Sequence, residues 1–346
     1  MRIVFWAMRI GSKIFGTNES EFMRIFKICF VFFITLFPIL LFYQIPLLIH
    51  PSRFGSQTDL SHIYARSVLE GKSEAAQHKQ VIVLGDSASS TAIHPEIATN
   101  TLNLSMWAAS YLESEQVLTK YLENVGKPQC VIIMNSYIPS MYWGDWFPNY
   151  VAHNNWWSLS ELFNMWVSHE ESWFRGSLRF LKNLPERFRL ESSYLKFFQY
   201  GIWNENRYSA LSKIFDTKFG SFIVEAEKGT FGENFRPWHL LLEKPFSQDK
   251  NFDKSLNRIL SRLEKEEVPS FLVNFPISNS LEVESIQKHI QQRNAHLKKI
   301  GTYYSKNKFI NINSFLPAEY FHDNLHLNPS GALLFTKNLS ESGVCL

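Results

Sequence analysis

Residues 81–87 read VIVLGDS, an apolar and largely β-branched run that stops at a glycine and continues into an acid and a serine. A run of this kind is typical of a strand that is buried on both faces of a parallel sheet. The same pattern recurs at 131–134, 271–273 and 309–312, with stretches of helical periodicity between the runs. Strands that alternate with helices predict an α/β fold, in which helices cover both faces of a parallel sheet.

Polar residues follow the first of these strands at the place where such sheets bind ligands, outside the carboxyl ends of the strands. A serine hydroxyl becomes a good nucleophile only when a base takes its proton, and a tight turn after a strand would expose Ser87 to such a base. Backbone N–H groups at the start of the next helix would also stabilise an oxyanion. On the tripeptide GDS alone, an ordinary helix N-cap is still the better interpretation.

A second polar stretch, HDNLHLNPSGA at 322–332, changes that balance. It follows the predicted strand at 309–312 and precedes a predicted helix, so it belongs to the same edge of the sheet. The three-residue spacing lets the Asp323 carboxylate reach the His326 imidazole and fix its tautomer, as a serine–histidine pair requires. A lone acid and histidine would indicate only a solvated loop, but their combination with Ser87 indicates a catalytic triad.

The two motifs together resemble those of the SGNH (GDSL-like) hydrolases, whose first block holds GDS and whose last block is DxxH before a helix. The resemblance covers residues 79–137 and 268–340. It implies a three-layer α/β fold with a parallel sheet. It also implies Ser87 as the nucleophile, His326 as the general base and Asp323 as the residue that orients His326.

This family completes its oxyanion hole with a glycine and an asparagine from two middle blocks. In this sequence Ser105 stands in the glycine's place, within NLSMWA at 103–108, and would still offer a backbone N–H. The asparagine implied by the resemblance is Asn135, with Ser136 as the second choice. The residues around Asn135 read MNSY and depart from the family's GxND.

The stretch from 28 to 49 contains no charged residue. As a helix it would be about 33 Å long, enough to cross the hydrocarbon core of a bilayer. Five basic residues precede it, against Glu19 and Glu21, so the positive-inside rule predicts a cytoplasmic N-terminus and an exported remainder. The alternatives are a buried core helix and a cleaved signal peptide, which the length of the run opposes.

The middle of the chain breaks the alternation of strands and helices and is rich in tryptophan, so we predict a mostly helical insertion there. Its aromatic side chains are more often core than ligand platform, since tryptophan is heavily buried on average. The alternative is a surface that faces the membrane or a sugar chain. The predicted segments are a cytoplasmic tail (1–27), a transmembrane anchor (28–49), a linker (50–78), the first half of the α/β domain (79–137), the insertion (138–245) and the second half (246–346).

The composition excludes some partners and leaves other properties open. A formal net charge of +3 over 346 residues is too small for a nucleic-acid-binding surface, and no nucleic-acid motif is present. The three cysteines, Cys29, Cys130 and Cys345, have the spacing of neither a disulfide framework nor a metal site, so they leave the redox compartment open. The histidines show no ligand spacing either, and we predict no metal and no cofactor.

An anchor that precedes an exported GDS domain resembles the membrane-tethered SGNH branch that acylates cell-envelope polymers, with DltD of teichoic acid D-alanylation and the alginate O-acetylation proteins. The resemblance implies an O-acyltransferase or esterase in the inner (cytoplasmic) membrane, with a periplasmic or otherwise extracytoplasmic catalytic domain. It also implies a polysaccharide or polymer acceptor and a multi-pass membrane O-acyltransferase as partner. Two alternatives stay open: a catalytically inactive envelope protein that binds polymer or that partner, and a lipid esterase at the membrane.

Overall fold

The computed structural model describes residues 61, 64–65, 67–71, 79–107, 109–135, 159–170, 172–187, 217–221, 242–247 and 250–346. The chain divides into two compact units, Met1–Phe54 and Gly55–Leu346, and every described residue belongs to the second. The predicted anchor at 28–49 and its tail therefore lie outside the described residues. Within the described ranges, no helix has the length and apolar character that crossing a bilayer requires.

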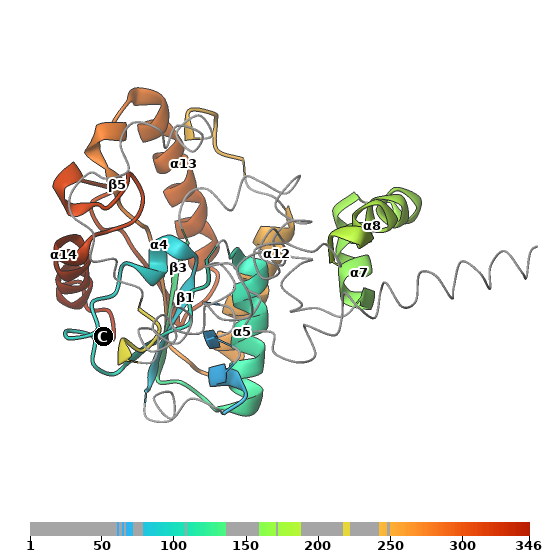
Figure 1. Ribbon diagram of the computed structural model, residues 1–346, viewed down its shortest axis with the longest axis horizontal. Helices are drawn as coiled ribbons and strands as arrows, with labels where there is room; N and C mark the ends of the chain where they lie inside the picture. The colour runs from blue at the N-terminus through green and yellow to red at the C-terminus, as the bar shows by residue number, and fades with distance from the viewer. Residues whose placement is uncertain are drawn as a thin grey trace, which may run out of the picture. The chain divides into compact units, whose positions relative to one another are not determined.

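Among the described residues, five parallel strands form one sheet in the order β2-β1-β3-β4-β6 (Figure 1). All residues of the first four strands along the chain are buried, which explains why they read as nearly continuous apolar runs. The prediction of an α/β fold with a parallel sheet is confirmed. The strands are β1 (Val81–Gly85), β2 (Thr101–Asn103), β3 (Cys130–Met134), β4 (Ser270–Val273) and β6 (Asn307–Ile310).

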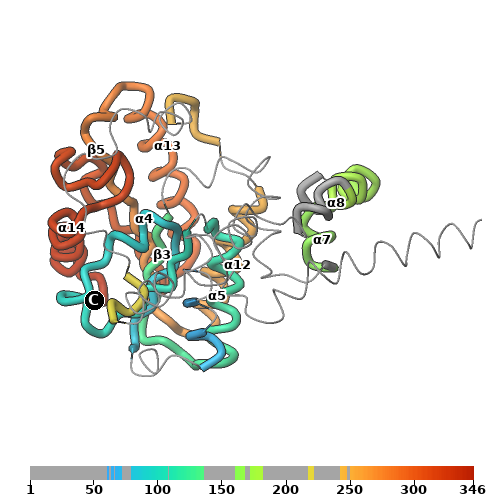
Figure 2. Tube along the Cα trace, viewed as in Figure 1, coloured from blue at the N-terminus to red at the C-terminus, as the bar shows by residue number. Residues whose placement is uncertain are grey.

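Alternate residues of the central strands contribute to two separate cores, one on each face of the sheet. Ile82 and Leu84 belong to one core, and Val81 and Val83 belong to the other. Figure 2 shows the helices of the two cores on opposite sides of the strands. The sheet is therefore the middle of three layers. The first core contains α5 (Tyr111–Asn124), α12 (Lys250–Lys265) and α13 (Glu284–Gly301), and the second contains α14 (Pro329–Glu341).

A small two-stranded parallel sheet pairs β5 (Ile277–Ser278), which follows β4 in the chain, with β7 (Phe315–Leu316), which follows β6. The strand predicted at 309–312 ends earlier, at Ile310. The reason is that the Asn274 side chain takes over the backbone of Ile312, accepting from its N–H at 2.6 Å and donating to its carbonyl at 2.8 Å. These bonds fix the direction in which the chain leaves the sheet toward 322–332.

Two helices, α7 (Leu159–Glu170) and α8 (Trp173–Arg187), lie within the predicted insertion. Most of the remaining insertion lies outside the described residues, as does its first boundary at 138. The second boundary at 245 lies within the described range 242–247, and both boundaries stay predictions. Trp166 of α7 is buried and joins the core that contains α5 and α12, as expected for a core aromatic residue. Trp173 of α8, in contrast, is 67% exposed.

Cys130, the first residue of β3, forms a disulfide with Cys345. The two residues are 215 positions apart. They meet because the chain returns after α14 to the core on that face of the sheet, which Val344 joins as a buried side chain. The spacing of the cysteines, which is not that of a disulfide framework, gave no prediction of this pairing, since spacing rules detect only closely spaced frameworks. A structural disulfide is typical of proteins that fold in an oxidising compartment.

Removing this disulfide should destabilise the domain. It closes a loop of 215 residues, so it removes much conformational entropy from the unfolded chain. We expect Cys130→Ser combined with Cys345→Ser to lower the free energy of unfolding by about 2–5 kcal/mol, measured by urea denaturation. The control is Cys29→Ser, which leaves the disulfide intact. Identical unfolding curves for the native protein with and without a thiol reductant would contradict the pairing.

Candidate active site

Ser87 is held by a tight turn between β1 and the short helix α4 (Ser87–Ser90). The turn can form because Gly85 has no side chain: a Cβ there would collide with the Met134 carbonyl and with Ser89. Ser89 Oγ donates to that same carbonyl at 2.6 Å, which ties the turn to β3. The Asp86 carboxylate caps α4 by accepting from the N–H groups of Ala88 and Ser89 at 3.1 and 3.3 Å. Asp86 is thus the N-cap, and Ser87 is the first helical residue, with a partly exposed side chain.

The loop that carries Asp323 and His326 is closed at both ends. Phe321 and Leu327 pair in an antiparallel bridge, and the His322 N–H donates to the His326 carbonyl at 2.8 Å. Within the loop, Asp323 Oδ1 accepts from the backbone N–H groups of Leu325 and His326 at 2.8 and 2.7 Å. One carboxylate oxygen therefore shapes the backbone and leaves the other free to contact the imidazole.

The structure brings Ser87, His326 and Asp323 into one hydrogen-bonded line. Ser87 Oγ lies 2.9 Å from His326 Nε2, and His326 Nδ1 lies 2.7 Å from Asp323 Oδ2. The serine and the histidine are 239 residues apart in the sequence. Only 24% of the His326 side chain and 8% of the Asp323 side chain are exposed. With Nδ1–H donating to the carboxylate, Nε2 is left as the acceptor for the serine hydroxyl.

Nearby carboxylates oppose the effect of burial on the pKa of His326. Burial favours the neutral imidazole and lowers its pKa, but the hydrogen bond and the charge of Asp323, with the charge of Asp86, outweigh it. The pKa of His326 therefore lies above its ordinary value. For Asp323, burial raises the pKa, but the hydrogen bond and charge of the His326 ring, together with the backbone N–H groups of Leu325 and His326, outweigh it, so the pKa falls below its ordinary value. At neutral pH Asp323 is consequently an anion that can stabilise an imidazolium.

This electrostatic balance predicts how Asp323→Asn alters His326. Without the carboxylate, burial becomes the main influence on the ring, so the pKa of His326 should fall below its value in the native protein. The measurement is a pH titration by NMR with isotope-labelled histidine, with the His326 signal assigned from a His326→Gln variant. His289, whose pKa is lowered by burial, serves as the internal control and should titrate alike in both proteins. An unchanged His326 titration would show that Asp323 does not set its charge.

Ser105, predicted to offer its backbone N–H to an oxyanion, uses that group elsewhere. Its N–H donates to Asn103 Oδ1 at 3.1 Å, and Asn103 Nδ2 donates to the Ser89 carbonyl at 3.1 Å. The side chain of Asn103, the last residue of β2, thus occupies the Ser105 N–H that was predicted to bind the oxyanion. The Ser105 hydroxyl is buried and has no hydrogen-bond partner among the described residues. Any contribution of Ser105 to an oxyanion would therefore come from its hydroxyl.

Asn135, the other predicted oxyanion residue, directly follows β3 and is 3% exposed. Its amide donates to the Ala109 carbonyl at 3.3 Å, and because an amide group carries two N–H bonds, one donor remains. The backbone carbonyl of Asn135 accepts a hydrogen bond from Arg293 Nη2 at 2.6 Å. Ser136, the second choice, lies outside the described residues. The backbone N–H of Ser87 makes no hydrogen bond within the described part of the chain and is a further donor.

Arg293 is a buried residue of the site region that the sequence analysis missed. It lies on α13 and is 1% exposed, among the apolar residues Ile286, Ile290 and Leu297 on the buried side of that helix. Its guanidinium also hydrogen-bonds the Tyr111 side chain at the start of α5. An arginine within the apolar stripe of an amphipathic helix was the available signal, because such a charge is buried only when it has partners.

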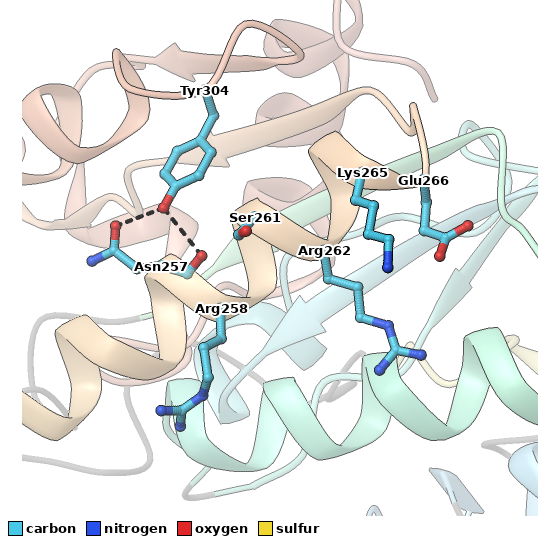
Figure 3. A pocket seen from close by; sticks show the side chains of 7 residues that line it. All are labelled: Asn257, Arg258, Ser261, Arg262, Lys265, Glu266 and Tyr304. Atoms are coloured by element: carbon cyan, nitrogen blue, oxygen red, sulfur yellow. Dashed lines mark hydrogen bonds between the residues drawn. The ribbon is translucent and has the colours of Figure 1, made fainter.

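The groove in Figure 3 lies along α12 and takes no part in this site. Lys265 marks the end of α12 that leads into β4, so the groove reaches the amino-terminal edge of the sheet, whereas Ser87 lies at the carboxyl edge. Its two arginines are paired with acids of α5, Arg258 with Glu115 and Arg262 with Glu123. It is lined by Asn257, Arg258, Ser261, Arg262, Lys265, Glu266 and Tyr304. Elsewhere in the described ranges, no cluster of three or more potential metal ligands occurs.

Comparison with known proteins gives a distant structural similarity. No protein-family model matches the chain, and no curated protein matches its sequence. Among solved structures, the chain is similar to a Streptococcus pneumonia protein described as a candidate platelet activating factor. The two chains are 10% identical, with a TM-score of 0.39, and the similarity covers 82% of this chain and 90% of the other. A similarity of this extent transfers no activity to the present chain.

Proposed function

We propose that this protein is an SGNH-type serine enzyme that transfers or hydrolyses acyl esters through an acyl-enzyme on Ser87. The observation that carries the proposal is the hydrogen-bonded line from Ser87 Oγ through His326 to Asp323, at 2.9 and 2.7 Å. A buried carboxylate, an imidazole held in one tautomer and a partly exposed serine are what this chemistry needs. The arrangement is recognised by its geometry and by the role of each group.

The first half of the reaction forms the acyl-enzyme. Ser87 Oγ attacks the acyl carbonyl carbon while His326 Nε2 takes the hydroxyl proton, and the resulting imidazolium is stabilised by the Asp323 anion. The tetrahedral intermediate carries its negative charge on the former carbonyl oxygen. When the intermediate collapses, His326 returns the proton to the departing oxygen, and the acyl group stays on Ser87 as an ester.

The second half transfers the acyl group to an acceptor. His326 Nε2 deprotonates a sugar hydroxyl or a water molecule, which attacks the Ser87 ester and leaves with the acyl group. The proton then returns from His326 to Ser87 Oγ, which regenerates the enzyme. A hydroxyl acceptor makes the protein a transferase, and water makes it an esterase.

The oxyanion donors in this proposal are the Ser87 backbone N–H and the remaining N–H of the Asn135 amide. Asn135 is held by two hydrogen bonds: Arg293 donates to its backbone carbonyl, and its side-chain amide donates to the Ala109 carbonyl. A fixed donor needs no reorganisation as charge develops, and one such donor is typically worth about 3 kcal/mol of transition-state stabilisation. The Ser105 N–H, which Asn103 already uses, is not part of this proposal.

We place the reaction outside the cytoplasm, on a cell-envelope polysaccharide or other polymer, with a multi-pass membrane O-acyltransferase as the source of the acyl group. Support comes from the uncharged stretch at 28–49 with its basic flank, which predicts a single-pass anchor with an exported domain. The disulfide between Cys130 and Cys345 adds independent support, because such bonds form in oxidising compartments.

Turnover of an acyl ester tests the proposal. The full-length protein in detergent should hydrolyse p-nitrophenyl acetate, and Ser87→Ala and His326→Ala should each lower the rate by about a thousandfold or more. The matched control is His296→Ala. His296 Nε2 lies 2.8 Å from Asp253 Oδ1, so this variant removes a comparable histidine–aspartate pair that does not contact Ser87. It should leave the rate of hydrolysis unchanged.

The second candidate is a non-catalytic envelope protein that keeps the fold and binds polymer or the membrane partner. The occupied N–H of Ser105 favours it, because one donor of the family's usual oxyanion hole is engaged. This second candidate predicts that the native protein and Ser87→Ala, both shown to be folded, hydrolyse p-nitrophenyl acetate at the same background rate. That result would overturn the catalytic proposal.

A further inference from the structure

The helix α8 has an apolar face that is open to solvent. Trp173, Phe174, Leu178 and Leu181 are 67%, 66%, 52% and 60% exposed. The described part of the chain exposes seven large hydrophobic side chains, and four of them are these. At about 100° per residue they fall within an arc of roughly 140° on the helix, which also contains Ser177, so they form an apolar stripe along one side of it. Single exposed apolar residues are common, but a stripe of this kind marks an interaction surface.

Contacts with α7 hold this stripe away from the α/β domain. Phe180 of α8 packs edge-on against Phe163 of α7, with ring centroids 5.4 Å apart. Gly176 of α8 approaches the backbone of Val167 so closely that a Cβ would collide with it. Helix α7 is in turn fixed to the core by buried side chains, among them Trp166. The packed side of α8 therefore faces α7. Trp173, at the edge of the stripe, also meets Phe163 edge-on, with ring centroids 6.3 Å apart, and the rest of the stripe faces outward.

Basic residues flank the stripe. Arg175 and Arg179 are exposed and follow the apolar arc on the helix surface, next to the position of Lys182. Over Trp173–Arg187 the helix has four basic residues and one acidic residue, and so a net charge of +3. A helix with large apolar residues on one face, basic residues beside them and tryptophan at its start has the composition of an interfacial membrane helix.

We propose that α8 docks the exported domain onto an anionic lipid bilayer, with its apolar stripe among the headgroups and its basic residues against lipid phosphates. The predicted anchor at 28–49 keeps a bilayer within reach, because only residues 50–63 separate it from Tyr64, which already belongs to the domain core. A second copy of the chain is a poorer occupant, since two such faces would bring their arginines against each other. Anionic lipid has the complementary charge, and each basic residue near such a surface strengthens binding. This inference does not depend on the chemistry of Ser87.

The test uses full-length protein in lipid nanodiscs and one fluorescent probe that responds to its environment. Cys29→Ser leaves Cys130 and Cys345, which the disulfide protects from labelling. The probe is attached to Phe174→Cys, and the matched control carries it at Tyr303→Cys, whose native side chain is 68% exposed against 66% for Phe174. Nanodiscs are made from phosphatidylcholine alone or with phosphatidylglycerol, and quenchers are a lipid-bound nitroxide and aqueous iodide.

We expect the Phe174→Cys probe to be quenched by the nitroxide and shielded from iodide when phosphatidylglycerol is present, whereas the Tyr303→Cys probe stays open to iodide. Arg175→Gln with Arg179→Gln should lower the ratio of docked to undocked protein by roughly tenfold or more. Equal iodide access for the two probes would overturn the proposal. Shielding of Phe174→Cys from iodide without quenching by the nitroxide would overturn it as well, because protein would then cover the stripe.

Discussion

The carboxyl end of β1 has no room for a side chain, and the position of the candidate site depends on this restriction. Gly85 lies against the Met134 carbonyl and Ser89, so the chain can make this turn directly after the strand only with a residue that has no side chain. The turn makes Asp86 the cap of α4 and places Ser87 at its first residue. Because β1 and β3 run parallel in register, with Gly85 opposite Met134, the same edge also holds Asn135. A bulkier residue at 85 would displace both segments.

The second half of the site reaches this edge through hydrogen bonds that control the backbone. Asn274 ends the β6 ladder by binding Ile312, and the loop that follows is closed by the bridge between Phe321 and Leu327. Asp323 then uses one oxygen for backbone N–H groups and the other for His326. The position of His326 is thus fixed by neighbours in the loop before it contacts Ser87, which is the preorganisation that general-base chemistry requires.

The sequence was sufficient to predict the features that follow from local patterns. Strands buried on both faces leave continuous apolar runs, so β1, β3 and β4 could be recognised, and the sheet edge followed from their order. Contacts between distant residues could not be recognised in this way. The disulfide joins residues 215 positions apart, and Asn274 acts on a residue 38 positions away. The hydrogen bond from Ser105 to Asn103 is local, yet a motif that substitutes serine for glycine gives no sign of it.

The central claim is that Ser87 is an activated nucleophile, and covalent labelling tests it most directly. The folded full-length protein is treated with a fluorophosphonate, and its intact mass is measured by mass spectrometry. The account predicts one adduct on the native protein and on the exposed-serine control Ser261→Ala, and none on Ser87→Ala or His326→Ala. An adduct that persists in Ser87→Ala, or a folded native protein that takes none, would contradict the account.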